Sequence, residues 1–289
     1  MAVRIIDGKG IAAEVRSEVA ERVAGLKGRG VTPGLAAVLV GDDEPSKIYV
    51  AGKVKACAEV GIHSERLDLP GDISQADLVA ELRRLNDDPD VHGILVQLPF
   101  PEHIDVLAVH EALSPEKDVD GLTPVSVGRM VRGEATLLPC TPLGIVEMLV
   151  RSKIPIEHAE VVIVGRGQLV GMPLAIMLSQ KAANANATVT LCHTGTRDVI
   201  VHTRRAEILI VAAGRPGTVT ADMITAGATV VDVAVNRLED GRLVGDVEFD
   251  SVSKVAGAIT PVPGGVGPMT IAMLLANTTT AAELAAGAA

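Results

Sequence analysis

The stretch EVVIVGRGQLVGMP, residues 160–173, places a short apolar run directly before a turn that contains three glycines. Residues 160–164 predict a buried strand, and Gly165, Gly167 and Gly171 predict a turn that opens a helix. Glycines allow the backbone to approach a phosphate group, which the free N–H groups at a helix N-terminus attract. The spacing G-x-G-x-x-x-G is one residue longer than the usual dinucleotide fingerprint. For this motif alone, a plain glycine turn is an equal alternative.

Further apolar runs follow the glycine turn at regular intervals. They lie at residues 188–192, 207–211 and 228–233, with a weaker one near 257–259. Continuous apolar runs of this length are typical of strands whose two faces are both covered. Residues 141–267 therefore predict a Rossmann-like domain with a parallel sheet, preceded by a loop and a helix at 139–151.

The first half of the chain alternates helical and strand patterns as well. One helical face is marked by apolar residues that recur every four positions: Ile11, Val15, Val19 and Val23. The following segments predict a strand at 34–41, a helix at 45–60 that ends at Gly61, a helix around 78–85 and a strand at 91–97. This alternation predicts an N-terminal α/β domain over residues 1–140, and a further helix is expected at 268–289.

The composition limits the classes of partner. The chain has 289 residues, of which 48% are apolar, and a formal net charge of −10. Nucleic acids and anionic membranes require basic surface, so neither is expected as a partner. The sequence shows no signal peptide pattern and no apolar run that could span a membrane, so a soluble, cytoplasmic protein is expected. The three cysteines are widely spaced, which predicts neither a disulfide framework nor a metal site.

The residues after the second strand of the 141–267 domain bear on the choice of cofactor. NAD sites usually carry an acidic residue there to bind the ribose hydroxyls, whereas this chain has Cys192, His193 and Thr194. Arg166, in the glycine turn, offers a cation instead. A cation with hydroxyl donors suits a 2′-phosphate, so NADP is the favoured cofactor. The alternative is that Arg166 is a surface residue and that NAD binds without the acid.

The only tyrosine of the chain, Tyr49, precedes Lys53 by four residues in a predicted helix, so both lie on one helical face. Short-chain dehydrogenases use such a pair with the tyrosine as the acid. In that class the pair follows the glycine motif, whereas here it precedes it, which argues against this assignment. A second hypothesis makes Lys53 the acid–base group and Tyr49 a platform for a flat ligand. The third alternative is an amphipathic pair without a catalytic function.

Three further segments favour a ligand site. The sequence VQLPFP, residues 96–101, puts the amide of Gln97 at the end of a predicted strand, where α/β sheets bind ligands. The sequence PEKDVDG, residues 115–121, is a charged loop that ends in a turn. The stretch TPVPGGVGPMT, residues 260–270, is too rich in proline and glycine for the interior of a helix or strand. It predicts a rigid loop that a ligand can approach closely.

Together these segments resemble one family, the bifunctional methylenetetrahydrofolate dehydrogenase/methenyltetrahydrofolate cyclohydrolases. Seven motifs match in order across nearly the whole chain: GDDEPSKIYVAGKVKAC, GILVQLPFP, PEKDVDGLTP, LLPCTPLGI, VVIVGRGQLVGMPLA, VGDVEF and ITPVPGGVGPMTIAMLL. The resemblance implies two α/β domains with a folate cleft between them, and a C-terminal helix that packs back on the N-terminal domain. It also implies oxidation of 5,10-methylenetetrahydrofolate with NADP+ and hydrolysis of the methenyl product to 10-formyltetrahydrofolate, in one-carbon metabolism and purine biosynthesis.

The resemblance also implies roles for the matching positions. The catalytic and folate-binding residues are expected to be Tyr49, Lys53, Gln97 and Asp120. Lys53 transfers protons, Gln97 helps to set its charge state, and Tyr49 lies against the folate rings. Asp120 binds the polar edge of the pterin, and Gly264 and Gly265 let their loop pass close to the folate. Cofactor contacts are expected at Gly165, Arg166, Gly167, Val170, Gly171, His193, Thr194, Gly214 and Val235.

Some positions depart from the family pattern. The family usually has serine where this chain has Gly167, and Ser-Arg or Ser-Lys where it has Thr194-Gly195, so possible phosphate contacts are lost. Ala234 replaces a usual glycine. A homodimer is implied by the resemblance only. The alternatives are a relative with one of the two activities, or a non-catalytic NADP- or folate-binding regulator. A regulator would not need a proton-transfer lysine, so the intact Lys53 argues against it.

Overall fold

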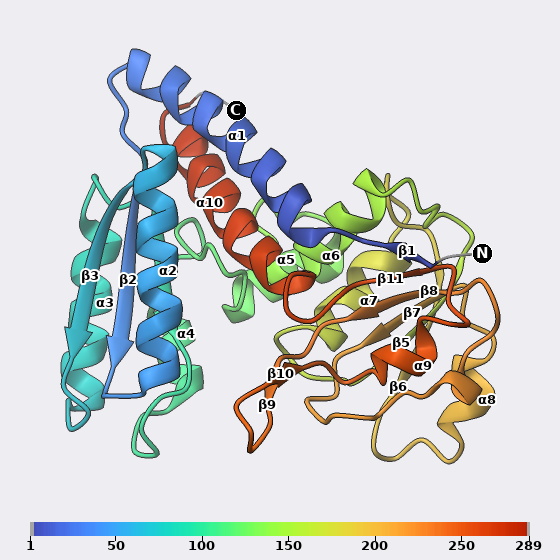
Figure 1. Cartoon of the computed structure of the whole chain (residues 1–289). Helices are drawn as coiled ribbons and strands as arrows, with labels where there is room; N and C mark the ends of the chain where they lie inside the picture. The colour runs from blue at the N-terminus through green and yellow to red at the C-terminus, as the bar shows by residue number, and fades with distance from the viewer. Residues whose placement is uncertain (1–2, 288–289) are drawn as a thin grey trace. The chain divides into compact units, whose positions relative to one another are not determined.

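The computed structural model describes residues 3–287, which form two compact units. Unit 1 comprises Met1–Ala13 and Thr141–Thr270, and unit 2 comprises Glu14–Cys140 and Ile271–Ala289. Both are α/β structures with parallel sheets, so the predicted fold class is confirmed (Figure 1). Helices α1 (Gly8–Gly28) and α10 (Val266–Ala285) begin in unit 1 and continue in unit 2.

The sheet of unit 2 has three parallel strands in the order β3-β2-β4. They are β2 (Gly34–Val40), β3 (His63–Leu69) and β4 (Gly93–Gln97). Helices α2 (Glu44–Val60) and α3 (Gln75–Asp87) make the crossovers between them, and α4 (Val106–Ala112) and α5 (Pro124–Arg132) follow. The central strand β2 is buried along its whole length, which explains its continuous apolar sequence.

One core cluster of unit 2 lies between the sheet and helices α3 and α4. Ala36, Val38 and Val40 alternate along β2 and therefore point to the same face of the sheet. The fully buried leucines of α3 pack in this cluster at helical spacing: Leu78, Leu82 and Leu85. The predicted helix and both predicted strands of this region are confirmed.

Helix α2 is defined by strong signals at both ends. The carboxylate of Asp43 accepts a 2.9 Å hydrogen bond from the backbone N–H of Ser46, which caps the N-terminus. At the other end, Gly61 adopts φ +85°, the left-handed conformation that favours glycine at a helix C-terminus. The sequence prediction of a helix over 45–60 that ends at Gly61 is confirmed.

Unit 1 contains a six-stranded sheet in the order β1-β11-β8-β7-β5-β6, and every neighbouring pair is parallel. Its strands are β1 (Arg4–Ile5), β5 (Glu160–Val164), β6 (Thr188–Cys192), β7 (Ile208–Val211), β8 (Thr229–Asp232) and β11 (Ala258–Ile259). Other elements are α6 (Cys140–Arg151), α7 (Gly171–Ser179), α8 (Val199–Thr203), α9 (Phe249–Val252), the 3-10 helix at Ala221–Met223, and the hairpin of β9 (Asn236–Arg237) with β10 (Leu243–Val244).

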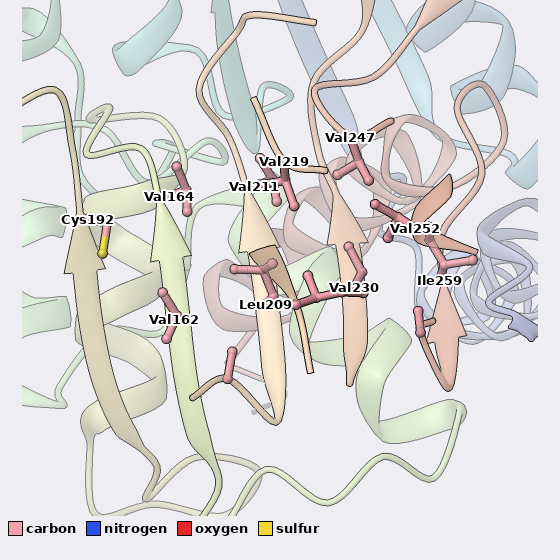
Figure 2. Packing of buried hydrophobic residues seen from close by; sticks show 13 residues of the cluster. Val162, Val164, Cys192, Leu209, Val211, Val219, Val230, Val247, Val252 and Ile259 are labelled. Carbon is pink, nitrogen blue, oxygen red and sulfur yellow. The ribbon is translucent and has the colours of Figure 1, made fainter. Parts of the chain in front are cut away.

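The register of this sheet places apolar residues in rows across the strands. Val162, Leu209, Val230 and Ile259 are neighbours on β5, β7, β8 and β11, and all four belong to one buried cluster (Figure 2). The next residues along three of these strands, Ile163, Ile210 and Val231, are equally buried, although they point to the opposite face. Both faces are therefore covered, as the sequence predicts.

The strand order creates a switch point in unit 1. After β5 the chain adds β6 on one side of that strand and then β7 on the other side. The loops after the neighbouring strands β5 and β7 therefore leave the carboxyl end of the sheet in opposite directions. In open α/β sheets this crevice is where ligands bind.

Candidate functional site

The predicted acid–base residue, Lys53, is buried in the middle of α2 with only 7% of its surface exposed. Its Nζ donates a 3.0 Å hydrogen bond to Oε1 of Gln97, the last residue of β4. Nε2 of Gln97 in turn donates a 2.7 Å bond to the carbonyl of Leu98. Because that second bond holds the amide nitrogen away from Lys53, the amide oxygen faces the lysine. The two predicted residues are thus in direct contact.

Tyr49 lies one helical turn before Lys53 and differs from it in exposure. Tyr49 is 52% exposed. Within residues 3–287 its hydroxyl makes no hydrogen bond, so the ring is not held by a polar anchor in unit 2. An exposed ring beside a buried amine can offer a flat surface to a ligand and a proton-transfer group next to it.

Asp120 occupies a tight turn after β4. The turn is held to the strand by a 2.8 Å bond from Ile94 N–H to the carbonyl of Lys117. The buried carboxylate of Asp118 accepts a 2.8 Å bond from Thr123 N–H, which closes the turn. Gly121 adopts φ +65°, so a residue with a side chain is disfavoured there. Within residues 3–287, no backbone N–H of this turn donates a hydrogen bond to the half-buried Asp120 carboxylate.

Two residues of this region, Cys140 and Asn277, were not identified as site residues from the sequence. Burial, and next the charge of Asp120, raise the pKa of the Cys140 thiol well above its usual value, while the charge of Lys53 acts in the opposite direction. The thiol therefore lies within electrostatic reach of both predicted catalytic groups. Nδ2 of Asn277, on α10, donates bonds of 2.7 Å to Val119 O and 2.8 Å to Leu138 O. It fixes the segments that carry Asp120 and Cys140.

In unit 1, the glycine turn after β5 has a steric explanation. Gly165 adopts φ +117°, and a Cβ atom there would lie 2.1 Å from Ala212 O. A Cβ atom on Gly171 would lie 1.9 Å from Gly165 O. A Cβ atom on Gly167 would meet no atom within 4 Å, so this position is open. The first and third glycines shape the turn, and the second leaves space beside it.

The other predicted cofactor residues lie at the same edge of the sheet. Val170 is the N-cap residue of α7, and no side chain caps this helix within the described residues. His193 and Thr194 follow β6, Gly214 follows β7 and Val235 follows β8. Arg166 and Thr194 are exposed, as a phosphate-binding cation and hydroxyl need to be. The structure brings these residues together at the carboxyl ends of four parallel strands.

These observations fit a dinucleotide with a 2′-phosphate. The open side of Gly167 is a cradle that a side chain would fill, and the start of α7 offers backbone N–H groups to a pyrophosphate. Arg166, in the turn after β5, supplies a cation, and His193 and Thr194, after β6, supply polar donors; none of these three residues is acidic. The donor set therefore suits NADP.

Gly264 and Gly265 lie in unit 1, in the loop after β11. Gly264 adopts φ +107°, and its carbonyl accepts a 3.0 Å bond from Lys9 N–H. A Cβ atom on Gly265 would lie 2.6 Å from Pro261 O. Gly264 is therefore favoured by its backbone conformation, and Gly265 is required by the packing of this loop. Lys53, Gln97, Asp120 and Tyr49 belong to unit 2.

The comparisons with known proteins identify the family. A model of the tetrahydrofolate dehydrogenase/cyclohydrolase NAD(P)-binding domain matches residues 139–286, and a model of the catalytic domain of the same proteins matches residues 6–120. The chain belongs to the tetrahydrofolate dehydrogenase/cyclohydrolase family. The motif-based resemblance is thereby confirmed.

Individual members of this family match the chain along its length. The bifunctional protein FolD of Syntrophus aciditrophicus (strain SB) is 54% identical over 292 residues, which covers 99% of this chain and all of the relative. The crystal structure of the bifunctional FolD methylenetetrahydrofolate dehydrogenase/cyclohydrolase from Campylobacter jejuni has a TM-score of 0.95 at 47% identity and covers 98% of this chain and 99% of its own. The FolD structure from Trypanosoma brucei, complexed with NADP cofactor and an inhibitor, has a TM-score of 0.92 at 40% identity, with 99% of both chains covered.

Between residues 3 and 287, no group of three or more His, Cys, Asp or Glu side chains is arranged to hold a metal ion. In the same part of the chain, the helices lack the length and apolar character needed to cross a membrane. The three cysteines, Cys57, Cys140 and Cys192, are buried and free.

Proposed function

We propose that this chain oxidises 5,10-methylenetetrahydrofolate with NADP+ and hydrolyses the methenyl product to 10-formyltetrahydrofolate. The observation that carries the proposal is the buried Lys53, hydrogen-bonded at 3.0 Å to Gln97 in a member of this family. Residues 1–140, with helix α10 (Val266–Ala285), would bind the folate. Residues 141–267 would bind NADP.

The first reaction is a hydride transfer. NADP+, when bound, would supply the acceptor for the hydride that leaves the methylene carbon. The loss of hydride leaves a cation that the two neighbouring ring nitrogens stabilise, so the protein mainly has to orient the carbon. The turn from Gly165 to Gly171 and the Arg166 guanidinium would hold the cofactor. Tyr49 and Asp120 would hold the folate, by contact with its rings and by hydrogen bonds to the polar edge of the pterin.

The second reaction is a hydrolysis that needs proton transfer. Water adds to the methenyl carbon and loses one proton. One C–N bond then breaks, the departing nitrogen gains a proton, and the hydroxyl releases its remaining proton to solvent as the formyl C=O forms. In its neutral form, the Lys53 amine can donate one N–H to Gln97 and keep its lone pair for the proton from water. The bond to Gln97 fixes the direction of that lone pair. Lys53 would then return the proton to the nitrogen.

A single assay tests this proposal. The protein is mixed with methylenetetrahydrofolate and NADP+, and the absorbances of NADPH and methenyltetrahydrofolate are followed together. NADPH with only transient methenyl absorbance is the expected result. Persistent methenyl absorbance would show a dehydrogenase alone, and direct hydration of added methenyltetrahydrofolate without NADPH formation would show a cyclohydrolase alone. No signal in either assay would leave a folate- or NADP-binding regulator.

The cofactor preference has its own test. Arg166 would pair with the 2′-phosphate, which NAD+ lacks, so KM for NADP+ should be lower than KM for NAD+. In the variant Arg166→Ala, KM for NADP+ should rise about tenfold or more while KM for NAD+ changes little. A clear preference of the unmodified protein for NAD+ would overturn the assignment of NADP.

We also propose that the protein acts in the cytoplasm as a homodimer. This follows from its membership of the family rather than from a surface of either unit. Sedimentation of the purified chain measures its mass directly. A monomer at the concentrations used for activity would exclude the dimer as the active form.

A further inference from the structure

The motif VGDVEF, residues 244–249, matches the family pattern but has no role in the mechanism above. Its acidic residue, Asp246, is completely buried. One oxygen, Oδ2, accepts bonds of 2.6 Å from Ala213 N–H and 2.8 Å from Gly214 N–H. The other, Oδ1, accepts a 2.9 Å bond from the side-chain amide of Asn236. One carboxylate thus satisfies three donors from two loops.

The two loops that Asp246 joins both leave the carboxyl edge of the sheet. Ala213 and Gly214 follow β7, and Val235 and Asn236 follow β8. Gly214 and Val235 are among the residues predicted to touch the cofactor, and Val235 is 43% exposed. Ala213 and Gly214 turn their N–H groups inward to the carboxylate while the residues themselves are exposed. A Cβ atom on Gly214 would meet no atom within 4 Å, so the outer side of this loop is open.

The rest of the motif holds Asp246 in place. The backbone N–H groups of Asp246 and Val247 donate bonds of 2.9 Å and 3.0 Å to the two oxygens of the buried Asp232, at the end of β8. A Cβ atom on Gly245 would lie 1.8 Å from Oδ2 of Asp232, so only glycine fits between the two carboxylates. Gly245 leaves room for Asp232, and the backbone N–H groups of Asp246 and Val247 bind it. The Gly-Asp-Val sequence thus holds the Asp246 carboxylate toward the two loops.

We propose that Asp246 is a positioning residue that sets the shape of the nicotinamide dinucleotide site by tying the loop after β7 to the loop after β8. This inference rests on one part of the proposed function, namely that Gly214 and Val235 contact the cofactor. A carboxylate that accepts two successive backbone N–H groups orients both peptides at once. Without it, these groups would turn toward solvent and the loop would lose the conformation that meets the cofactor.

The two activities of the chain provide the internal control. Hydrolysis of added methenyltetrahydrofolate requires no NADP, whereas dinucleotide binding requires the two loops. In Asp246→Ala we expect the Kd for NADP+, measured by calorimetry without folate, to rise about tenfold or more. The cyclohydrolase rate should stay close to that of the unmodified chain, and the unfolding midpoint should fall only by the cost of the donors left unpaired. Asp246→Asn can turn its side-chain amide oxygen to Ala213 and Gly214. Its Kd for NADP+ should therefore lie between that of the unmodified chain and that of Asp246→Ala.

Two further variants keep the test decisive. Asn236→Ala breaks only the bond to the loop after β8 and should weaken NADP+ binding, but less than Asp246→Ala does. If Asp246→Ala does not fold, Asn236→Ala still tests the proposal. Asp240→Ala changes an exposed carboxylate on the same hairpin and should leave every measurement unchanged. An unchanged Kd in Asp246→Ala, or in both Asp246→Asn and Asn236→Ala, would overturn the proposal. A cyclohydrolase rate that falls by the same factor as the affinity for NADP+, together with a lower unfolding midpoint, would also overturn the proposal, because this result indicates a purely structural role. Failure of the unmodified chain to bind NADP+ would instead refute the proposed function.

Discussion

Nζ of Lys53 donates a 3.0 Å hydrogen bond to Oε1 of Gln97, which joins the middle of α2 to the carboxyl end of β4. The bond places an amine at the edge of a parallel sheet, where ligands bind. The helix contributes the proton-transfer group and the strand contributes the amide that orients it. The two residues are 44 positions apart in sequence, so only the fold brings them together.

Replacement of Lys53 by methionine should separate the two activities. Methionine keeps the apolar part of the side chain, so the buried site remains filled, but it cannot accept or return a proton. Cyclohydrolase kcat should fall about 100-fold or more, the usual contribution of a general acid–base group. Some dehydrogenase activity should survive, because hydride transfer depends mainly on orientation. Both rates can be measured on the same sample.

The matched control is Lys55→Met, which changes an exposed lysine two residues further along the same helix. It removes the same charge from the protein but not from the site. Both activities should stay close to those of the unmodified chain. A Lys53→Met variant with an unaltered cyclohydrolase rate would refute the role assigned to Lys53.

Tyr49 provides a second test, because its ring and its hydroxyl can be removed separately. The hydroxyl makes no hydrogen bond within residues 3–287, so Tyr49→Phe should keep much of both activities. Tyr49→Ala removes the ring and should raise KM for the folate about tenfold, since contact with a flat ligand is lost. A loss in Tyr49→Phe as large as that in Lys53→Met would make the tyrosine hydroxyl the proton-transfer group.

Much of the fold could be predicted from local sequence patterns, because buried strands carry continuous apolar runs. The sequence does not predict strand β3, because this strand carries no continuous apolar run. It lies at the edge of its sheet, and its sequence HSERLDL is polar and partly exposed. Strand β1, with two residues, is too short to produce a periodic signal. Its place in the sheet depends on pairing with β11, which lies more than 250 residues away.

The site could be predicted only in part. Lys53 and Gln97 stand in short motifs at a helix and at a strand end, so their residue types and positions are informative. Asn277 is one of several polar residues of helix α10, and its partners Val119 and Leu138 are 158 and 139 residues away. No local pattern indicates such a contact. The roles of Cys140 and Asn277 become visible only when the turn around Asp120 and its neighbours are placed in space.

The glycine turn predicts different outcomes for two similar substitutions. In Gly171→Ala, the new Cβ atom would lie 1.9 Å from Gly165 O, so the turn or the start of α7 has to move. Forcing an additional methyl group into a packed site costs about 1–3 kcal/mol. The unfolding midpoint should fall, and NADP+ binding should weaken with it.

Gly167→Ala is the matched control, because a Cβ atom at this position would meet no atom within 4 Å. Its unfolding midpoint should equal that of the unmodified chain within experimental error. Calorimetry measures the binding of NADP+, and thermal unfolding followed by circular dichroism measures the unfolding midpoint. Equal midpoints for the two alanine variants would contradict the steric explanation of the glycine pattern.

The buried Asp232 predicts a specific dependence of stability on pH. Burial raises the pKa of Asp232 to about 6 from its ordinary value of 3.8; the backbone N–H groups of Asp246, Val247 and Ala234 oppose this shift, and the charge of Asp246 adds to it. Between these two values the folded chain keeps a proton that the unfolded chain releases. The free energy of unfolding that this proton contributes is therefore fully present below pH 3.8 and is lost as the pH rises through about 6. The shift corresponds to about 3 kcal/mol at most.

The variant Asp232→Asn removes this titration while it keeps the size of the side chain. The difference in the free energy of unfolding between the unmodified chain and Asp232→Asn should be largest near pH 4 and should shrink as the pH approaches about 7. Denaturant titrations at a series of pH values, followed by circular dichroism, measure it. Asp240→Asn is the control: hydrogen bonds from the backbone N–H and then from the side chain of Arg242 lower the pKa of the Asp240 carboxyl, so this residue stays ionised in the upper part of the pH range. A difference for Asp232→Asn that does not change with pH would show that Asp232 is already ionised in the folded chain.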